Sequence, residues 1–325
     1  MNQCKTYSIS VVVPTFNRAS LISETLDRIL KQTRKPDEII VVNDGSTDDT
    51  LSVLRHYREQ LRVISIPNSG DLVARNTGLQ IARGDLVAFC DDDDLWQNDF
   101  IRLMAMFWEK YTKPICAFSN FREIVNWKWA DHSKLDKAPV EFWSGFEWIE
   151  AGYGQFRTSA IRNLIVFQPF FTSCLMVERE RFLAIGGWDE GVSRMIGCDF
   201  ATALRIAEHP PVGVLQQPLV GIRKHAGNFS GNVQRMNLGD ADVLAYVLST
   251  RPQLAIYTEI INKSMEARRL AAFDSAFANG DFSEAERISR LLSTPPSGIR
   301  YWLKCMIIQL PPPLRDRAWR ILSGG

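Results

Sequence analysis

The chain has 325 residues, of which 46% are hydrophobic and 23% are charged, and its formal net charge is +1. This composition excludes a disordered or fibrous chain and is ordinary for a soluble enzyme, while the balanced charge gives no indication of a nucleic-acid partner. The length predicts one large domain with an appendage. Six cysteines without CxxC spacing favour a reducing cytoplasm. We expect neither a signal peptide nor a transmembrane helix, because the apolar stretches are short or interrupted.

The first 120 residues alternate short apolar runs with helical patterns. Runs rich in β-branched residues predict strands over 8–14, 37–44, 61–67 and 85–90. Apolar residues at helical spacing predict helices over 19–33, 48–60 and 71–82. Continuous apolar strands that alternate with helices indicate a mainly parallel sheet covered on both faces. The predicted fold class is therefore α/β.

The pattern changes further along the chain. After a helix over 98–111 and a strand over 114–121, residues 126–165 carry four tryptophans and show no clear period, which predicts an irregular insertion. A strand, a short helix and a glycine turn are then predicted within 171–190, a helix over 198–209 and a strand over 211–225. From about residue 237 the pattern is helical, and we expect a domain boundary near 231–237.

Polar residues follow three of the predicted strands. These are Pro14-Thr15, Asn43-Asp44-Gly45 and the four aspartates 91–94. In an open parallel sheet, ligands bind outside the carboxyl ends of the strands, so this edge is where a site is expected. The chain has no GxGxxG after the first strand and no GxxxxGK[ST], which argues against dinucleotide-binding and P-loop proteins. The loop "PTFNRAS" contains no glycine, which argues against a sugar nucleotidyltransferase.

The run "FCDDDDLW", residues 89–96, has two interpretations. If residues 91–93 are extended, Asp91 and Asp93 face the same way and form a carboxylate pair suited to Mg²⁺ or Mn²⁺. Two charges about 4 Å apart repel by about 1 kcal/mol in water and by about 4 kcal/mol at an effective dielectric near 20, which favours a counter-cation. The alternative is an acidic start of the helix over 98–111.

Five blocks of this chain resemble family 2 glycosyltransferases with the GT-A nucleotide-diphospho-sugar-binding fold. They are "VVVPTFNR", "IIVVNDGSTDDT", "ARNTGLQIARGDLVAFCDDDDLW", "GGWDE" and "CDFATALR". They occur in the family's order and approximate spacing over residues 8–230. The resemblance implies a Rossmann-like GT-A domain over 1–235, with a nucleotide-sugar-binding half over 1–120 and an acceptor half over 121–235. A helical region over 236–325 would follow.

The resemblance also implies residues for the donor. Pro14 and Thr15 would border the nucleotide, Asp44 would accept a hydrogen bond from the base, and Arg75 would lie against base or phosphate. Asp91 and Asp93 would hold a divalent metal and, through it, the diphosphate. The alternatives are a turn aspartate at Asp44 and an exposed helix arginine at Arg75.

Three further residues are also expected to bind the donor, and each has an alternative role. Asp92 is counted among the donor-binding residues, although Asp92 and Asp94 are also expected to serve the turn and the helix that follows. Arg223 and His225 belong to the segment "RKHAGNFSG", which resembles a basic loop, and would meet the diphosphate. A solvated basic loop is the alternative for these two.

In the acceptor half, Trp188 and Asp189 of "GGWDE" would lie beside the acceptor, with Trp188 offering a ring face to a sugar. A core tryptophan is the alternative. Asp199 would be the catalytic base, or else only a helix cap. The family usually has a Glu-Asp pair where this chain has Cys198-Asp199, so the acidic neighbour of the base is missing.

The implied reaction is a metal-dependent, inverting transfer of a sugar from a nucleotide-diphosphate donor to a glycan or lipid-linked acceptor, in cell-surface polysaccharide synthesis. For this family, a UDP-sugar is the donor most commonly expected. A nucleotide-sugar-binding module without catalysis is the alternative, motivated by Cys198. A third possibility is a scaffold that acts through its helical tail.

The tail from residue 294 onward has five basic residues and one acid, Asp316, interleaved with aromatic and aliphatic residues. Such a segment can lie on an anionic membrane, or it can pack on its own domain. Pro311, Pro312 and Pro313 interrupt any continuous helix there. We therefore expect a cytoplasmic protein with a peripheral contact at the cytoplasmic face of the membrane as one option, and the oligomeric state stays open.

Overall fold

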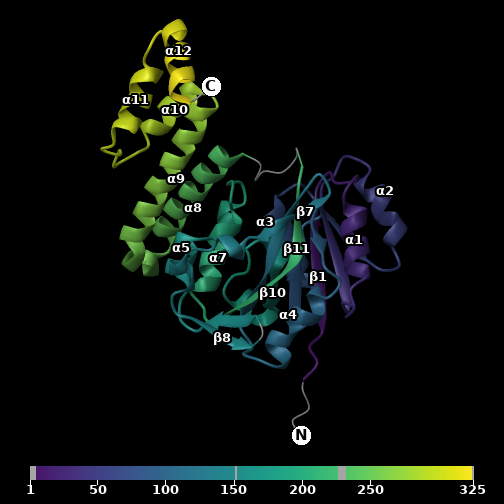
Figure 1. Ribbon diagram of the computed structural model, residues 1–325. Coiled ribbons are helices and arrows are strands. Elements are labelled where there is room, and N and C mark those ends of the chain that lie inside the picture. Colours follow the sequence, from purple (N-terminus) through teal and green to yellow (C-terminus); the bar gives the residue numbers. More distant parts are fainter. Residues whose placement is uncertain (1–4, 151, 226–231, 324–325) are drawn as a thin grey trace. The chain divides into compact units, whose positions relative to one another are not determined.

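The structure is a computed structural model that describes residues 5–150, 152–225 and 232–323 (Figure 1). The chain divides into two compact units. The first, which we call the sheet unit, comprises residues 1–194 and 199–226, and the second, the helical unit, comprises residues 195–198 and 227–325. None of the helices in the described ranges is both long enough and apolar enough to cross a membrane.

The sheet unit is built on one mixed sheet of eleven strands. Its central order is β3-β2-β1-β4-β10-β6-β11-β9-β8, with β5 paired to β11 and β7 to β6. β1 to β4 are parallel, and β6 and β11 share their direction, whereas β10 lies antiparallel between β4 and β6. The strands are β1 Ile9–Thr15, β2 Glu38–Asp44, β3 Arg62–Ile66, β4 Leu86–Phe89, β5 Leu95–Trp96, β6 Cys116–Val125, β7 Lys128–Ser133, β8 Phe146–Glu150, β9 Tyr153–Phe156, β10 Leu175–Glu178 and β11 Val212–Lys224.

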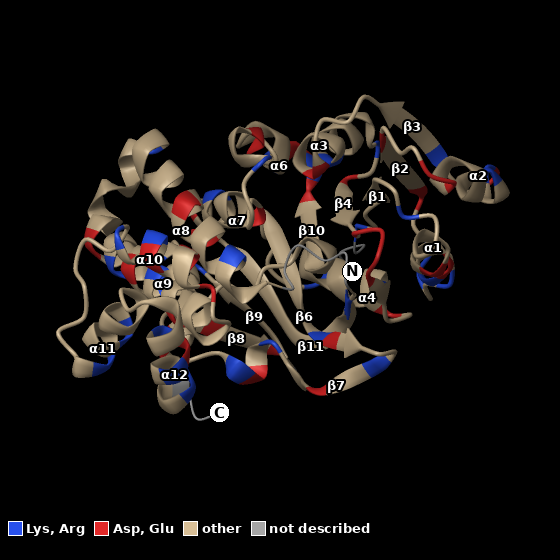
Figure 2. Cartoon of the chain, turned by 90° about the horizontal axis from the view of Figure 1, so that it is seen from above, with Lys and Arg blue, Asp and Glu red and all other residues tan. Residues whose placement is uncertain are grey.

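Helices cover both faces of this sheet. Figure 2 shows α3 and α6 on one side and α1 and α4 on the other. The helices are α1 Ile22–Leu30, α2 Thr50–Leu54, α3 Asp71–Ile81, α4 Phe100–Glu109, α5 Ile161–Val166, α6 Arg179–Ala184 and α7 Asp199–Ala207. The predicted α/β class, a mainly parallel sheet flanked by helices, is confirmed. The predicted helix over 48–60 is shorter, since α2 ends at Leu54 and a 3₁₀ turn, Arg55–Tyr57, follows.

The irregular insertion predicted over 126–165 is wrong. This segment contributes β7, β8 and β9 to the sheet, where β9 pairs with β11 and β8 pairs with β9. An aromatic cluster holds the β8–β9 hairpin, with Trp143, Trp148 and Phe156 each packed near Phe146. The strands are short and β8 is largely exposed, so they lack the continuous apolar run that identifies a buried strand in a sequence.

The helical unit contains α8 Val233–Thr250, α9 Thr258–Ala278, α10 Phe282–Ser289, α11 Ile299–Ile308 and α12 Pro312–Ser323. The predicted C-terminal helical region is confirmed, and the expected interruption at Pro311 to Pro313 separates α11 from α12. The unit has its own apolar core, which includes Phe273, Phe277 and Tyr301.

The parallel half of the sheet unit depends on a close approach between α3 and β1. A Cβ atom at Gly78 in α3 would lie 2.4 Å from a Val12 methyl carbon in β1. Both positions are buried, and only a residue without a side chain allows this separation. The contact brings the first turn of α3 to the edge where the strands end.

We predict that Gly78→Ala destabilises the protein by about 1–3 kcal/mol, because the added methyl overlaps Val12. Without that overlap, alanine would stabilise a helix relative to glycine. The cost should be less than additive with Val12→Ala, which removes the clashing methyls. Urea unfolding measures all three variants, with Gln80→Ala on the exposed side of α3 as control. A Gly78→Ala protein as stable as the wild type would contradict the close approach.

Candidate functional site

Three strand ends meet at one edge of the sheet, because β1 is parallel to both β2 and β4. Thr15 is the last residue of β1, Asp44 is the last residue of β2, and Asp91 follows β4. Pro14 and Thr15 are buried. These predicted donor residues therefore lie on neighbouring strands.

Asp44 is engaged within the protein. Its two carboxylate oxygens accept hydrogen bonds from the backbone N–H groups of Ser69 and Gly70, at 2.7 and 2.9 Å. Asn68 also donates to the Asp44 carbonyl at 3.1 Å. Asp44 thus orders the loop that leads into α3, and its predicted contact with a base stays a prediction.

Residues Asp91 to Asp94, which we call the acidic turn, form a turn, so the condition of an extended segment on which the same-face pair of Asp91 and Asp93 depends is not met. The Asp94 amide donates to the Asp91 carbonyl at 3.2 Å and closes a turn, the red segment that follows β4 in Figure 2. Ser173 braces it: its hydroxyl accepts from the Asp91 amide at 2.9 Å and donates to Asp94 at 2.5 Å. Trp96 fixes Ser173 by donating to its carbonyl at 2.7 Å.

The expected role of Asp92 and Asp94 in the following helix is wrong. α4 begins at Phe100 with Asp99 at its N-terminal cap position, so the alternative that the aspartates start this helix also fails. Asp94 instead is buried, and besides Ser173 it accepts a hydrogen bond from the Arg223 amide at 3.2 Å. It is a structural residue of the turn.

The acidic turn is short of positive charge. Burial, and next the Asp93 charge, raise the pKa of Asp92 to about 7, and burial raises the pKa of Asp91 and Asp94 as well. Two basic side chains, Arg18 and His225, lie beside the turn. Arg18 is 3.5 Å from Asp92, and the His225 imidazole is 2.9 Å from Asp93.

Arg75, in α3, joins three carboxylates. Its guanidinium donates to Asp71 at 2.6 Å, to Asp91 at 2.8 Å and to Asp199 at 3.4 Å. The residue is 3% exposed, which excludes the exposed helix arginine, and these charges raise its pKa further above the usual value despite burial. Arg75 links the acidic turn to Asp199, a role that we did not predict, and its contact with a donor stays a prediction.

Asp199 is the first residue of α7, and a third of its side chain is exposed. Burial raises its pKa to about 6, and the Asp71 and Asp91 charges act in the same direction, whereas Arg75 opposes them. The N-terminal end of a helix stabilises the anion. A partly exposed carboxylate with this pKa can take up a proton close to neutral pH, which is what a general base requires.

Arg223 is not free to meet a diphosphate, and that prediction is wrong. Its guanidinium donates to Glu24 at 2.9 Å, to the Leu21 carbonyl at 3.2 Å and to Thr25 at 3.0 Å, and its Nε donates to the Asp93 carbonyl. The side chain is 5% exposed, so Arg223 ties β11 and the acidic turn to α1. The His225 imidazole lies beside Asp93, and its predicted contact with a diphosphate stays a prediction. Residues 226–231 of the predicted basic loop lie outside the described residues.

Trp188 does not offer a ring face to a sugar, and the core alternative is correct. The residue is 2% exposed and packs edge to face against Phe89 and Phe182. Asp189 is also buried and pairs with Arg205 at 2.9 Å. Its predicted contact with an acceptor stays a prediction.

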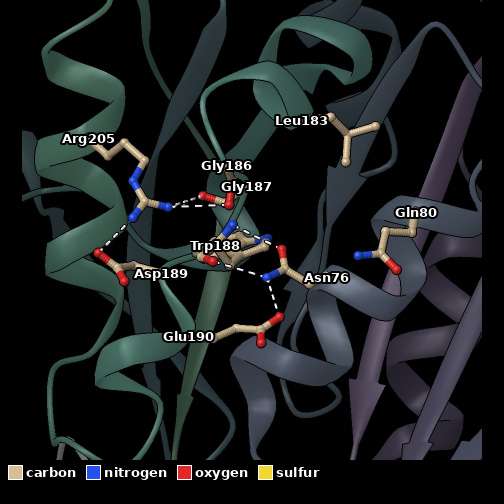
Figure 3. A pocket seen from close by; sticks show the side chains of 9 residues that line it. All are labelled: Asn76, Gln80, Leu183, Gly186, Gly187, Trp188, Asp189, Glu190 and Arg205. Atoms are coloured by element: carbon tan, nitrogen blue, oxygen red, sulfur yellow. Dashed lines mark hydrogen bonds and ion pairs between the residues drawn. The ribbon is translucent and has the colours of Figure 1, made fainter.

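Beside these residues the structure has a pocket of about 390 Å³ (Figure 3). Asn76 holds its wall by donating to the Trp188 carbonyl and to Glu190, at 3.0 and 2.7 Å. The lining residues are Asn76, Gln80, Leu183, Gly186, Gly187, Trp188, Asp189, Glu190 and Arg205.

Three residues that sequence reasoning missed complete the site: Arg18, Asp71 and Ser173. Asp71 stands four residues before Arg75, a spacing that brings side chains together on a helix, so this pair had a readable signal. Arg18 follows the first strand end within "PTFNR". Ser173 had no local signal, because its partners are about eighty residues away in the sequence.

Comparison with known proteins identifies the class. The model of the family "Glycosyl transferase family 2" matches residues 10–178, and the chain belongs to this family. A putative teichuronic acid biosynthesis glycosyltransferase, TuaG of Bacillus subtilis, is 37% identical over 115 residues, or 34% of this chain and 44% of the relative. Glycosyltransferase GlyA of Streptococcus pneumoniae is 38% identical over 99 residues, or 30% of this chain and 14% of the relative. The matched stretch thus spans less than half of these relatives.

Solved structures share the fold. A crystal structure of S. aureus TarS 1-349 in complex with UDP-GlcNAc superposes with a TM-score of 0.57 at 17% identity, covering 98% of this chain and 90% of that one. The mannosyltransferase PcManGT from Pyrobaculum calidifontis, in complex with GDP-Man and Mn²⁺, has a TM-score of 0.54 at 19% identity, covering 98% and 86%. The likeness shows a shared fold, in agreement with the predicted GT-A architecture.

The raised pKa of Asp92 predicts a pH dependence of stability. Between the unfolded value near 4 and about 7, the folded state holds a proton that the unfolded state has released, so the free energy of unfolding falls as pH rises through this window. Asp92 contributes at most about 4 kcal/mol to this fall. Asp92→Asn should remove the share of this fall that comes from Asp92 and leave the share from Asp91, Asp94 and Asp199, whose pKa values are also raised. Asp131→Asn, at an exposed position, should keep the whole fall. Urea unfolding at several pH values in EDTA measures this, and equal slopes in wild type and Asp92→Asn would contradict it.

Proposed function

We propose that the protein is a metal-dependent, inverting glycosyltransferase that moves a sugar from a nucleotide-diphosphate donor to a hydroxyl group. The observation that carries the proposal is Arg75, which contacts both Asp91 of the acidic turn and Asp199. One buried guanidinium thereby connects the expected metal ligands with the expected base. Membership of glycosyl transferase family 2 supports the same activity.

The residues present fit a divalent cation. Asp91 and Asp93 offer carboxylate oxygens, the ligands that Mg²⁺ and Mn²⁺ prefer. Burial and mutual repulsion raise the pKa of three carboxyls in the turn, so added positive charge would favour their ionised forms. A bound ion would supply Lewis-acid stabilisation to the departing diphosphate. We propose Asp91 and Asp93 as its ligands. The PcManGT complex, which shares the fold, contains Mn²⁺, and this supports a metal site.

Asp199 is proposed as the general base. It would accept the proton of the acceptor hydroxyl as that oxygen attacks the anomeric carbon opposite the leaving group, which inverts the configuration. Arg75 would hold its carboxylate in place. Asp71, bonded to the same guanidinium at 2.6 Å, would keep Arg75 oriented when Asp199 becomes neutral.

For the donor we propose a UDP-sugar, bordered by Pro14, Thr15 and Asp44, with the side chains of Arg18 and His225 beside the acidic turn. The acceptor would be a glycan or a lipid-linked glycan in cell-surface polysaccharide synthesis, on the cytoplasmic side. The name of TuaG refers to teichuronic acid biosynthesis, and TarS was crystallised with UDP-GlcNAc. Both favour a surface polymer and a uridine donor.

Two substitutions separate the proposed roles. Asp199→Asn should lower the transfer rate by about 10²–10⁴ fold, because the general base is lost, while thermal stabilisation by donor and Mn²⁺ stays near the wild-type value. Asp93→Asn should abolish the Mn²⁺-dependent part of that stabilisation. Thermal shift with a panel of nucleotide-diphosphate sugars, with and without Mn²⁺, measures binding, and Asp131→Asn serves as control.

Two other outcomes would contradict the proposed function. A rate near wild type in Asp199→Asn would exclude Asp199 as the base. A wild-type protein that binds donor and Mn²⁺ but neither transfers nor hydrolyses the sugar would be a nucleotide-sugar-binding module, the function to which Cys198 in place of an acidic residue points.

A further inference from the structure

The last two helices of the helical unit carry a feature that the proposed catalytic site does not use. Within this unit, α10, α11 and α12 gather around the C-terminal end of α9 (Figure 1). The shared core contains Phe273 and Phe277 from α9, and Tyr301 and Ile308 from α11. The inner sides of α11 and α12 therefore pack against the core of the helical unit.

α11 is apolar on its outer side as well. Ile299, Trp302 and Met306 stand at positions i, i+3 and i+7, which places them on one face of the helix. They are 75%, 52% and 59% exposed, whereas Tyr301 and Ile308 are buried. A helix that faces water on one side normally keeps that side polar, so this outer face is unusual for a protein that stays in water.

α12 repeats the arrangement. Trp319 points inward, since its indole N–H donates to the Phe277 carbonyl at 2.8 Å. Leu314 and Ile321, seven residues apart, share another face and are 58% and 77% exposed. The two interpretations of the tail from its sequence are therefore compatible: α11 and α12 pack on their own unit and also expose an apolar face.

Positive charge is concentrated on the same two helices. Residues 232–293 contain eight acidic and seven basic residues, whereas residues 294–323 contain one acidic and five basic residues. Lys304 pairs with Asp274 at 2.9 Å, and Arg315 lies 3.5 Å from Asp316. Arg300, Arg317 and Arg320 are exposed and make no ion pair with any residue in the described ranges.

We propose that α11 and α12 bind the surface of an anionic bilayer. The apolar residues of both helices would enter the boundary between headgroups and acyl chains, and Arg300, Arg317 and Arg320 would meet lipid phosphates. A second copy of this chain fits less well. In a symmetric dimer the same patch meets itself, so two sets of these three arginines would be brought together and would repel. This inference stands apart from the catalytic proposal, since it rests on the helical unit alone.

Sedimentation of the full chain with vesicles tests the proposal. Wild type should bind vesicles of phosphatidylcholine mixed with phosphatidylglycerol, bind phosphatidylcholine alone at least about tenfold more weakly, and dissociate at high salt. Trp302→Gln with Met306→Gln, and Arg317→Glu with Arg320→Glu, should each weaken binding by about tenfold or more. All four positions are exposed, and circular dichroism melting checks that the variants fold.

Two matched controls accompany these variants. Ile256→Gln replaces a more exposed aliphatic residue outside α11 and α12, and Arg162→Glu with Lys263→Glu makes the same change in net charge elsewhere. Both should bind as wild type does. The proposal is overturned if wild type does not bind anionic vesicles, or if the α11 and α12 variants bind as well as the controls. It is also overturned if light scattering shows that these variants only dissociate an oligomer.

Discussion

Four consecutive carboxylates at the end of a buried strand are the constraint on which the site depends. Asp92, Asp93 and Asp94 are each less than a tenth exposed, so their charges need partners from the protein. Those partners come from distant segments: α3, the loop after β1, and the end of β11. The charge at this one turn therefore explains why these segments converge at the edge of the sheet. Burial, and next the Asp93 charge, raise the pKa of Asp92, and a divalent ion at the turn would favour the ionised carboxylates.

Arg75 lies between the acidic turn and Asp199 and contacts both. On one side it pairs with Asp91, and on the other with Asp199, so the same guanidinium balances the charge of both. A cation at the acidic turn would compete with Arg75 for Asp91 and strengthen the hold of Arg75 on Asp199. In the proposed reaction, donor binding and the protonation of Asp199 would thus be coupled through one buried side chain. Asp71, four residues away on the same helix, accepts a third hydrogen bond from Arg75, at 2.6 Å.

The sequence predicted the parallel half of the fold well, because β1, β2 and β4 are buried on both faces and read as continuous apolar runs. β8 and β9 were missed because short strands near the sheet edge carry no such run. At the candidate site, motifs predict roles for Asp91, Asp93 and Asp199, which stay predictions. No local pattern reports the shape of the turn, since Ser173, which bonds Asp91 and Asp94, lies far along the chain. The burial of Trp188 and Arg223 likewise depends on tertiary contacts that no local pattern reports.

The central claim is that the acidic turn and Asp199 form one site for two substrates. The most direct measurement is anomalous scattering from Mn²⁺ in a crystal of the protein with a nucleotide-diphosphate sugar. The account predicts a manganese peak bonded to Asp91 and Asp93 at about 2.1–2.2 Å, with the diphosphate beside it and the anomeric carbon turned toward Asp199. A peak at other residues, or a donor whose anomeric carbon faces away from Asp199, would contradict it.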